Sequence, residues 1–504
     1  MTKLTTDPAT TYEAGAEEVL PLLERLPRVA TTSGDGEDRA AGEYYDADGF
    51  PLISAGVRLW ADGETGRWHL SMPPVDGGAY KTEAPADGGQ VPPQLLSLVR
   101  VHTRGRELRP VARITTTRTH RTLLDDRGRP LAEAIVDKVS AQTFGDSTTI
   151  SQWHHLKLRS VAHARKWVGE AEKRLRRSGL RPDRHQAELL RALDGQVPGT
   201  RPRPKARPLT RRSTAGEVVL TALQQHANRL KLLDPLVRRA EPDSVHQMRV
   251  TARRLRSTLQ SFGMIVDAAG TRRLASELRW LGTVLGGERD SEMLAARVEA
   301  HVRATPAELL LGAVQARVRT YFAPVQAASR SAVMNALDSP RYLALLDLLD
   351  GVLAAPPLTA AAARAAARVL PGAVGRDYRR LRRRIRRAAE AAPGEGRDTA
   401  LHNARKAAKR ARYAAETVSP VFGKHARRFA VRMKRVQAAL GDHHDAIIAR
   451  ATIRDMGVAA HLARDNAFSF GLFHERESEC ARRSEGRGWH AWDRGSRRKY
   501  RTWL

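Results

Sequence analysis

Two stretches of the sequence, VHQMRVTARRLRS at 245–257 and ALHNARKAAKRARYAAE at 400–416, share one pattern. Each contains a histidine, His246 or His402, that is followed by Lys or Arg three, seven, eight and ten positions later. Neither copy has an acidic residue between its histidine and its last cation. The cations are Arg249, Arg253, Arg254 and Arg256 in the first copy and Arg405, Lys409, Arg410 and Arg412 in the second.

The pattern predicts two amphipathic helices whose polar face is cationic. At about 100° per residue, offsets of zero, three, seven and ten fall within roughly a quarter-turn of one another. These positions form a stripe about 15 Å long at 1.5 Å per residue, while Met248, Leu255 and Leu259 lie on the opposite side. Like charges one turn apart repel, and a polyanion laid along the stripe would relieve that repulsion. A solvated basic face without a ligand is the alternative for either helix alone.

A second block follows each copy, LGGERDSEML at 285–294 and LGDHHDAIIA at 440–449. The blocks align Gly286 with Gly441 and Asp290 with Asp445, and each is predicted to end a helix. From histidine to aspartate there are 44 residues in one copy and 43 in the other. Arg279 and Lys434 also occupy matching positions in the helices that lead into the blocks. This repetition indicates an internal duplication of a multi-helix unit.

The composition favours an anionic partner. The chain of 504 residues has a formal net charge of +31 and a pI near 11.1, which suits nucleic acid, phosphate chains or an acidic membrane surface. Its one cysteine, Cys480, excludes an intrachain disulfide and a thiolate metal cluster. The polar N-terminus and the lack of a run of 18 apolar residues predict a cytoplasmic protein without membrane insertion.

The chain is predicted to contain two domains. Residues 1–195 alternate apolar and polar positions between turn sequences such as Asp125-Asp126-Arg127-Gly128, which predicts an α+β domain of antiparallel hairpins that ends in two helices. Residues 196–212 are rich in Pro, Gly and Arg and predict a basic linker. Residues 213–504 read as helices throughout, and with the duplication they predict an all-α domain of two pseudo-symmetric halves, about 213–350 and 359–504.

A further basic segment, RDYRRLRRRIRR at 376–387, carries eight arginines. Tyr378, Leu381 and Ile385 have helical spacing and are predicted to pack inward. On that basis Arg379, Arg383 and Arg386 share another face of the helix. An exposed basic helix without a ligand is the alternative.

The two motif copies and their trailing blocks resemble the CHAD domain, the conserved-histidine α-helical domain, over roughly 213–504. The resemblance implies two helical bundles that flank a positively charged cavity, and it implies that the cavity binds inorganic polyphosphate. A linear polyanion is held by many cations with little need for exact geometry. We therefore predict a polyphosphate site made of His246, Arg249, Arg253, Arg256, Arg279, Arg379, Arg383, Arg386, His402, Arg405, Lys409, Arg412 and Lys434.

Two features of this site have alternatives. The histidines would strengthen binding if protonated, so that affinity would rise as the pH falls through about 6.5, or they hydrogen-bond within the bundle and organise nearby cations. Asp290 and Asp445 invite a metal site, especially beside His443 and His444. A helix-end salt bridge to an arginine of the stripe is the better interpretation, because the first copy has Glu288-Arg289 in place of the two histidines.

The N-terminal region resembles a CYTH domain in the order of its segments, including YYD at 44–46, LISAGVRL at 52–59 and RWHLSMP at 67–73. The resemblance implies a triphosphate tunnel, an antiparallel barrel whose inward carboxylates bind a divalent metal. This chain departs from the family's motif, since Ser71 and Trp60 replace a lysine and an arginine. The last strand reads WHHLKLR at 153–159, with cations where the family has glutamates, and the segment DPATT at 7–11 lacks the E-x-E-x-K signature.

These departures predict a CYTH-like domain without catalytic activity and without a required cofactor. Arg113, Arg118, Lys157 and Arg159 would form a secondary anion site. The alternative is an enzyme, a Mg²⁺- or Mn²⁺-dependent triphosphatase with Glu83, Glu133 and Asp137 as metal ligands. A third class is nonspecific nucleic-acid binding, suggested by the charge and by the tail WHAWDRGSRRKYRTWL at 489–504. Polyphosphate is the expected partner, with association to polyphosphate granules in the cytoplasm.

Overall fold

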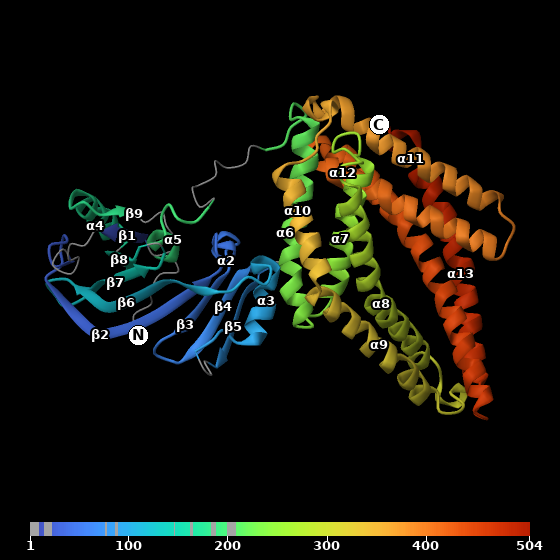
Figure 1. The fold of residues 1–504 in the computed structure, drawn as a ribbon, viewed down its shortest axis with the longest axis horizontal. Coiled ribbons are helices and arrows are strands. Elements are labelled where there is room, and N and C mark those ends of the chain that lie inside the picture. The colour runs from blue at the N-terminus through green and yellow to red at the C-terminus, as the bar shows by residue number, and fades with distance from the viewer. Residues whose placement is uncertain are drawn as a thin grey trace. The chain divides into compact units, whose positions relative to one another are not determined.

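A computed structural model of the protein describes residues 10–14, 23–75, 78–85, 89–145, 147–161, 165–182, 188–198 and 208–504. The chain divides into two compact units, Met1–Ala206 and Arg207–Leu504, which we describe separately (Figure 1). Residues 199–207 of the predicted linker lie outside the described residues, as do residues 7–9 of the segment compared with the CYTH signature.

The described residues of the N-terminal unit form one antiparallel sheet of nine strands, ordered β5-β4-β3-β2-β6-β7-β8-β1-β9. The strands are β1 Thr10–Ala14, β2 Thr31–Asp46, β3 Arg58–Asp62, β4 Arg67–Val75, β5 Gly78–Pro85, β6 Arg109–Leu124, β7 Pro130–Thr143, β8 Thr149–Ser160 and β9 Arg181–Pro182. This confirms the antiparallel architecture predicted for the N-terminal domain. The hairpin between β6 and β7 is also confirmed: Gly128 has φ +71°, and the Asp125 carboxylate accepts from the Arg127 and Arg129 amides.

The described residues of this unit include the helices α2 Pro51–Ser54, α3 Pro93–Thr103, α4 Arg165–Arg177 and α5 Glu188–Ala192. Leu158 of β8 packs with Trp167 of α4 in one buried cluster. Trp153 of β8 packs with Leu189 of α5 in another. Because side chains alternate along a strand, Lys157 shares the sheet face of Trp153, the face that α5 covers.

The C-terminal unit is helical and carries the duplication predicted from the sequence. Its α-helices are α6 Ala215–Arg238, α7 Ser244–Ser261, α8 Arg272–Arg303, α9 Val314–Asp338, α10 Pro340–Ala354, α11 Ala366–Glu390, α12 Glu395–Leu462 and α13 Phe468–Gly495. Gly423, with φ 56° and ψ −128°, divides α12 into two helical parts. The part before Gly423 therefore corresponds to α7, and the part after it corresponds to α8.

Reciprocal backbone hydrogen bonds join the starts of α6 and α11, the first helices of the two repeats. The Ala215 amide donates to the Arg364 carbonyl at 2.8 Å, and the Ala366 amide donates to the Ser213 carbonyl at 2.8 Å. Thr214 caps α6 in a capping box with Glu217. The two repeats thus begin side by side, which brings their basic helices into one bundle.

The predicted helix ends at the two LG blocks are wrong. α8 continues past Asp290 to Arg303, and α12 continues past Asp445 to Leu462. Glycine within a helix costs about 1 kcal/mol relative to alanine. Burial of the neighbouring Leu285 and Leu440 offsets that cost, so packing overrides the local preference. Within the described part of the chain, no helix is long and apolar enough to cross a membrane.

Candidate anion-binding site

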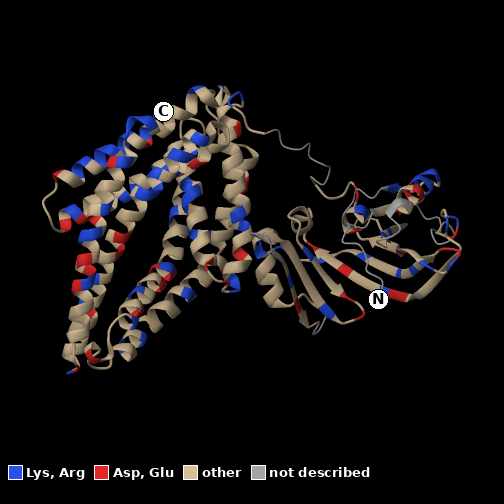
Figure 2. Cartoon of the chain, turned by 180° about the vertical axis from the view of Figure 1, so that it is seen from behind, with Lys and Arg blue, Asp and Glu red and all other residues tan. Residues whose placement is uncertain are grey.

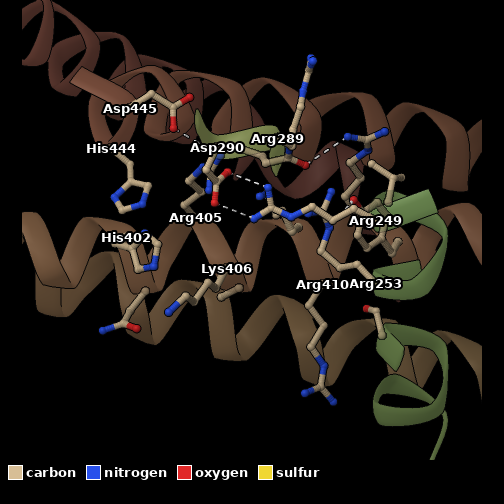
Figure 3. A pocket seen from close by; sticks show the side chains of 18 of the residues that line it. Arg249, Arg253, Arg289, Asp290, His402, Arg405, Lys406, Arg410, His444 and Asp445 are labelled. Carbon is tan, nitrogen blue, oxygen red and sulfur yellow. Dashed lines mark hydrogen bonds and ion pairs between the residues drawn. The ribbon is translucent and has the colours of Figure 1, made fainter. Parts of the chain in front are cut away.

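The helical unit contains an open cavity of about 1220 Å³ that is lined by α7, α8, α11 and both parts of α12. Twelve Lys or Arg residues and three histidines line it, against two carboxylates, Asp290 and Asp445 (Figure 3). We call it the basic cavity. Its cations are Arg249, Arg253, Arg256, Arg289, Arg297, Arg380, Arg384, Arg405, Lys406, Lys409, Arg410 and Arg412, and its histidines are His246, His402 and His444.

The structure brings together every residue that the repeated motif contributed to the predicted site. His246, Arg249, Arg253, Arg256, His402, Arg405, Lys409 and Arg412 all line the basic cavity. The predicted positions outside the motif do not line it: Arg279, Lys434, Arg379, Arg383 and Arg386. Of these, Arg383 lies in a smaller adjoining pocket. The internal repeat therefore identified cavity residues that isolated basic runs did not.

The face of α11 that was predicted to bind is corrected by the structure. Tyr378, Leu381 and Ile385 are buried as predicted, but Arg380 and Arg384 line the cavity. Asp377 accounts for the difference, because it is buried and bound from outside its own helix. Its carboxylate pairs with Arg410 of α12 at 2.8 Å and accepts from the Ser261 hydroxyl of α7 at 2.6 Å. Positions three and seven residues after Asp377 thereby turn towards the cavity.

Each repeat holds the first arginine of its motif in a matching cradle. Arg249 binds Asp290 with both ends of its guanidinium, at 2.6 and 3.2 Å (Figure 3). Arg405 lies 3.8 Å from Asp445. The predicted salt bridges to the aspartates are thus confirmed, although they lie in the middle of α8 and α12 rather than at helix ends.

The repeated glycine has a role in this cradle. A Cβ on Gly286 would lie 3.3 Å from Nη2 of Arg249, and a Cβ on Gly441 would lie 3.2 Å from Nε of Arg405. Both distances are tighter than ordinary van der Waals contact. The glycine therefore leaves room for the guanidinium against the helix, and the aspartate one turn later orients it.

A second network joins the repeats behind the cavity. Glu416 forms an ion pair with Arg254 at 2.8 Å and accepts a hydrogen bond from Arg412 at 2.6 Å. Both guanidiniums also lie over the ring of Tyr413, at 4.9 and 5.4 Å from its centroid, and Tyr413 accepts from Arg253 at 3.3 Å. Glu416 thus neutralises part of the positive charge of α7 and α12 at one side of the cavity.

Half of the cavity cations are not neutralised by carboxylates of the described residues. In the part of the chain that the structure describes, six cavity cations form no ion pair with Asp or Glu. They are Arg253, Arg256, Arg380, Arg384, Lys406 and Lys409. Such a concentration of like charge disfavours the empty protein and favours the binding of an anion.

Burial and repulsion depress the basicity of several cavity groups. Burial, followed by the charges of Arg405 and Arg253, lowers the pKa of Lys409 to about 6. Burial, followed by His444 and nearby lysines, lowers the pKa of His402 to about 4. Burial and Arg289 likewise lower the pKa of His246. The expectation that these histidines titrate near 6.5 is therefore wrong for the empty cavity, where they are neutral at pH 7.

The two motif histidines are also short of hydrogen-bond partners. Nδ1 of His246 and Nδ1 of His402 are buried and have no hydrogen-bond partner among the described residues. A buried polar atom without a partner is costly and uncommon in native proteins. The interpretation that hydrogen bonds within the bundle account for these histidines is therefore not supported at Nδ1.

The sequence analysis missed several cavity residues, of which three could have been found. Arg289 and His444 line the cavity, and both immediately precede the repeated aspartate. Aligning the two blocks by position identifies them. Arg297, Arg380, Arg384 and Lys406 carry no such signal. Arg410 belongs to the repeated motif, yet it was left out of the predicted set.

The predicted secondary anion site of the N-terminal unit is not one site. Arg118 binds Asp137 at 2.6 and 3.0 Å, and Lys157 binds the same carboxylate at 2.9 Å. Arg159 lies 4.0 Å from Glu133. Arg113 pairs at 2.7 Å with Glu43 of β2. Five positions separate Arg113 from Arg118 on β6, so the two side chains point to opposite faces of the sheet.

The candidate metal ligands do not form a shared site either. Glu83 on β5 pairs with Arg67 at 3.2 Å and approaches His69 at 3.4 Å, whereas Glu133 and Asp137 lie on β7, five strands away in the sheet order. Among the described residues, no three His, Cys, Asp or Glu side chains are grouped to hold a metal ion. Although burial alone would raise it, hydrogen bonds from Arg118 and Lys157 lower the pKa of Asp137. The residues present therefore do not fit a divalent metal ion.

Comparison with known proteins gives matches to one domain and to a full-length relative. The CHAD domain matches residues 221–454. The uncharacterized protein MT2285 of Mycobacterium tuberculosis strain CDC 1551 is 31% identical over 497 residues, covering 92% of this chain and 91% of that protein. PptA from Streptomyces chartreusis has a TM-score of 0.48 and 23% identity, covering 56% of this chain and 100% of that one. The CHAD domain from the plant Ricinus communis has a TM-score of 0.42 and 24% identity, covering 56% and 95%.

Proposed function

Because the chain belongs to the CHAD-domain family, we propose that its helical unit binds inorganic polyphosphate in the basic cavity. One observation supports this most strongly: two copies of a basic motif, far apart in the sequence, line a single cavity. A polyphosphate chain carries closely spaced charges and many acceptor oxygens. It could therefore contact cations of both repeats at once, without the exact geometry that a small anion requires. Association with polyphosphate granules would follow from such binding.

The cavity groups would have distinct roles towards a phosphate chain. Arg249 and Arg405 are oriented by Asp290 and Asp445, so their remaining donors are preorganised for phosphate oxygens. The unpaired cations supply most of the Coulomb attraction. The buried Nδ1 atoms of the motif histidines have no hydrogen-bond partner among the described residues, and a phosphate oxygen or a bridging water would supply one.

Calorimetric titration of the full chain with long-chain polyphosphate tests the proposal. We expect saturable binding that weakens steeply as salt concentration rises, because counterions are released from the polyanion. Binding that persists unchanged at high salt, or no binding at low salt, would count against the proposal.

The protein is expected to take up protons when it binds polyphosphate. In the empty cavity Lys409 has a pKa of about 6, so it is mostly neutral at pH 7.5. A bound polyanion stabilises the ammonium form and raises this pKa, so affinity should be highest below pH 6 and fall as the pH rises above it. Titrations at pH 7.5 in two buffers with different ionisation enthalpies measure the uptake.

The variant Lys409→Gln is the control for this prediction. It should take up about one proton fewer than the unsubstituted protein, since one titrating group is removed. Identical proton uptake by the two proteins would show that Lys409 does not sense the ligand.

We propose further that the N-terminal unit, with its CYTH resemblance, does not hydrolyse triphosphate. Asp137 is held by Arg118 and Lys157, and a cation that already neutralises a carboxylate competes with Mg²⁺ for it. Phosphate release from triphosphate in the presence of Mg²⁺ or Mn²⁺ is expected to stay at the level of a blank. Metal-dependent release that Glu133→Gln abolishes would establish the enzyme instead.

A further inference from the structure

A row of four arginines leads away from the basic cavity along α11. Arg380, Arg383, Arg384 and Arg387 line a pocket of about 420 Å³, and no other residue that the structure describes lines it. Spacings of three, four and seven place them on one side of the helix, over a length of about 10 Å. We call these four residues the outer stripe. Figure 2 shows the concentration of basic positions along this helix, which lies next to the mark of the C-terminus.

The outer stripe keeps its full charge. In the described part of the chain none of its four arginines pairs with a carboxylate, and the two acids of α11 are engaged elsewhere. Asp377 pairs with Arg410 at 2.8 Å, and Glu390 lies 3.5 Å from Arg386. Like charges at spacings of three and four destabilise a helix, so the stripe is an energetic cost that an anion would relieve.

The outer stripe is continuous with the basic cavity. Arg380 and Arg384 line both pockets. Burial lowers the pKa of the cavity residue Arg256, and repulsion from Arg279, Arg253 and Arg410 adds to this effect. The charge of Arg380 in turn adds to burial in lowering the pKa of Arg410. Neighbouring cations therefore form a continuous basic surface from the motif of α7 to the exposed side of α11.

We propose that the outer stripe is a second segment of the polyanion site, which makes the protein bind long phosphate chains more tightly than chains that end inside the cavity. The inference rests on the proposed function. A chain already held in the cavity meets the stripe as a tethered ligand, and the second contact therefore forms at high effective concentration. Arg383 and Arg387, which lie outside the cavity, would contact only long chains.

The test compares two ligands and two double variants of the full chain. The ligands are inorganic triphosphate and long-chain polyphosphate at equal ligand-molecule concentration. The stripe variant is Arg383→Gln with Arg387→Gln. The matched control is Arg382→Gln with Arg386→Gln, which removes the same charge from a neighbouring flank of the same helix and leaves both pockets intact.

The stripe variant should bind long chains about tenfold more weakly, because each lost contact to an exposed arginine is worth roughly two- to fivefold. Its affinity for triphosphate should change by less than about twofold. Its salt slope for long chains should fall by about 1.4, or roughly 0.7 for each lost phosphate contact. The control variant should keep the long-chain affinity.

Several results would overturn the inference. Equal losses for the two ligands, or equal losses in the two variants, would show that only overall charge matters. If the unsubstituted protein binds both ligands with the same affinity, chain length is not sensed, although the proposed function stands. If it binds neither, the proposed function fails first. If the stripe variant instead loses binding to phosphatidylserine vesicles while long-chain binding is unchanged, the stripe faces lipid.

Discussion

Replacing Arg249 and Arg405 together with alanine is expected to weaken polyphosphate binding by at least about 100-fold, since a hydrogen bond to a charged group contributes roughly 1.5–3 kcal/mol. The two arginines occupy the same position in the two repeats and are oriented by Asp290 and Asp445. Their removal also leaves both carboxylates facing the ligand. Fluorescence competition or calorimetry with long-chain polyphosphate measures the loss.

The fold should tolerate this double change. The side chains of Asp290 and Asp445 are 69% and 47% exposed, so water solvates them once their partners are gone. Such partly exposed pairs contribute at most about 1 kcal/mol each to stability. Thermal unfolding is therefore expected to shift by only a few degrees.

Arg279→Ala with Lys434→Ala is the matched control. Arg279 and Lys434 also occupy equivalent positions in the two repeats. Their replacement removes two positive charges, as the Arg249 and Arg405 variant does, but from α8 and α12. Both are exposed and neither lines the cavity. The control should retain affinity within a few-fold. If it loses as much as the Arg249 and Arg405 variant, net charge explains binding and the cavity does not.

Lys409→Met is expected to stabilise the empty protein while it weakens polyphosphate binding. The pKa of Lys409 is lowered from 10.5 to about 6. Keeping this amine neutral at pH 7 in the folded state therefore opposes folding by up to about 5 kcal/mol, at 1.36 kcal/mol for each pH unit between 7 and 10.5. Methionine fills similar space without that cost. Chemical denaturation should show an increase on the order of 2 kcal/mol.

The pH dependence identifies the cause. Between about pH 6 and 10.5 the unfolded chain holds the proton of Lys409 and the folded chain does not, so stability from this group rises with pH across that window. Below pH 6 both states hold the proton and the slope ends. The methionine variant should lose this slope.

Lys406→Met provides the comparison for Lys409. Lys406 also lines the cavity, but it is exposed. Its replacement should reduce affinity without stabilising the protein. If the two variants have the same free energy of unfolding, Lys409 is not held at a cost in the empty cavity.

Much of the architecture could be predicted from the sequence because the relevant signals are local or repeated. Alternation and turn residues predicted the antiparallel sheet, including the β6–β7 hairpin at Gly128. The duplication predicted two related helical repeats, and eight motif residues do line one cavity. Each of these features depends on spacing along the chain, which the sequence states directly.

The remaining features depend on contacts between distant segments. Asp377 and its partners on α7 and α12 decide which side of α11 faces the cavity. The spacing of the arginines in the sequence does not reveal these contacts. The basicity of His402 depends on how deeply tertiary packing buries it. In the N-terminal unit, the alternation of side chains along β6 already places Arg113 and Arg118 on opposite faces. The sequence alone therefore argues against putting both residues in one anion site.

The most direct measurement is a calorimetric titration of the full chain with long-chain polyphosphate and with duplex DNA, at matched phosphate concentration and across a salt series. If the basic cavity is the site, polyphosphate should bind more tightly than DNA at every salt concentration, and the affinity for polyphosphate should fall steeply with salt. Equal affinity for the two polyanions would contradict a specific cavity and would assign the binding to the overall positive charge of the chain.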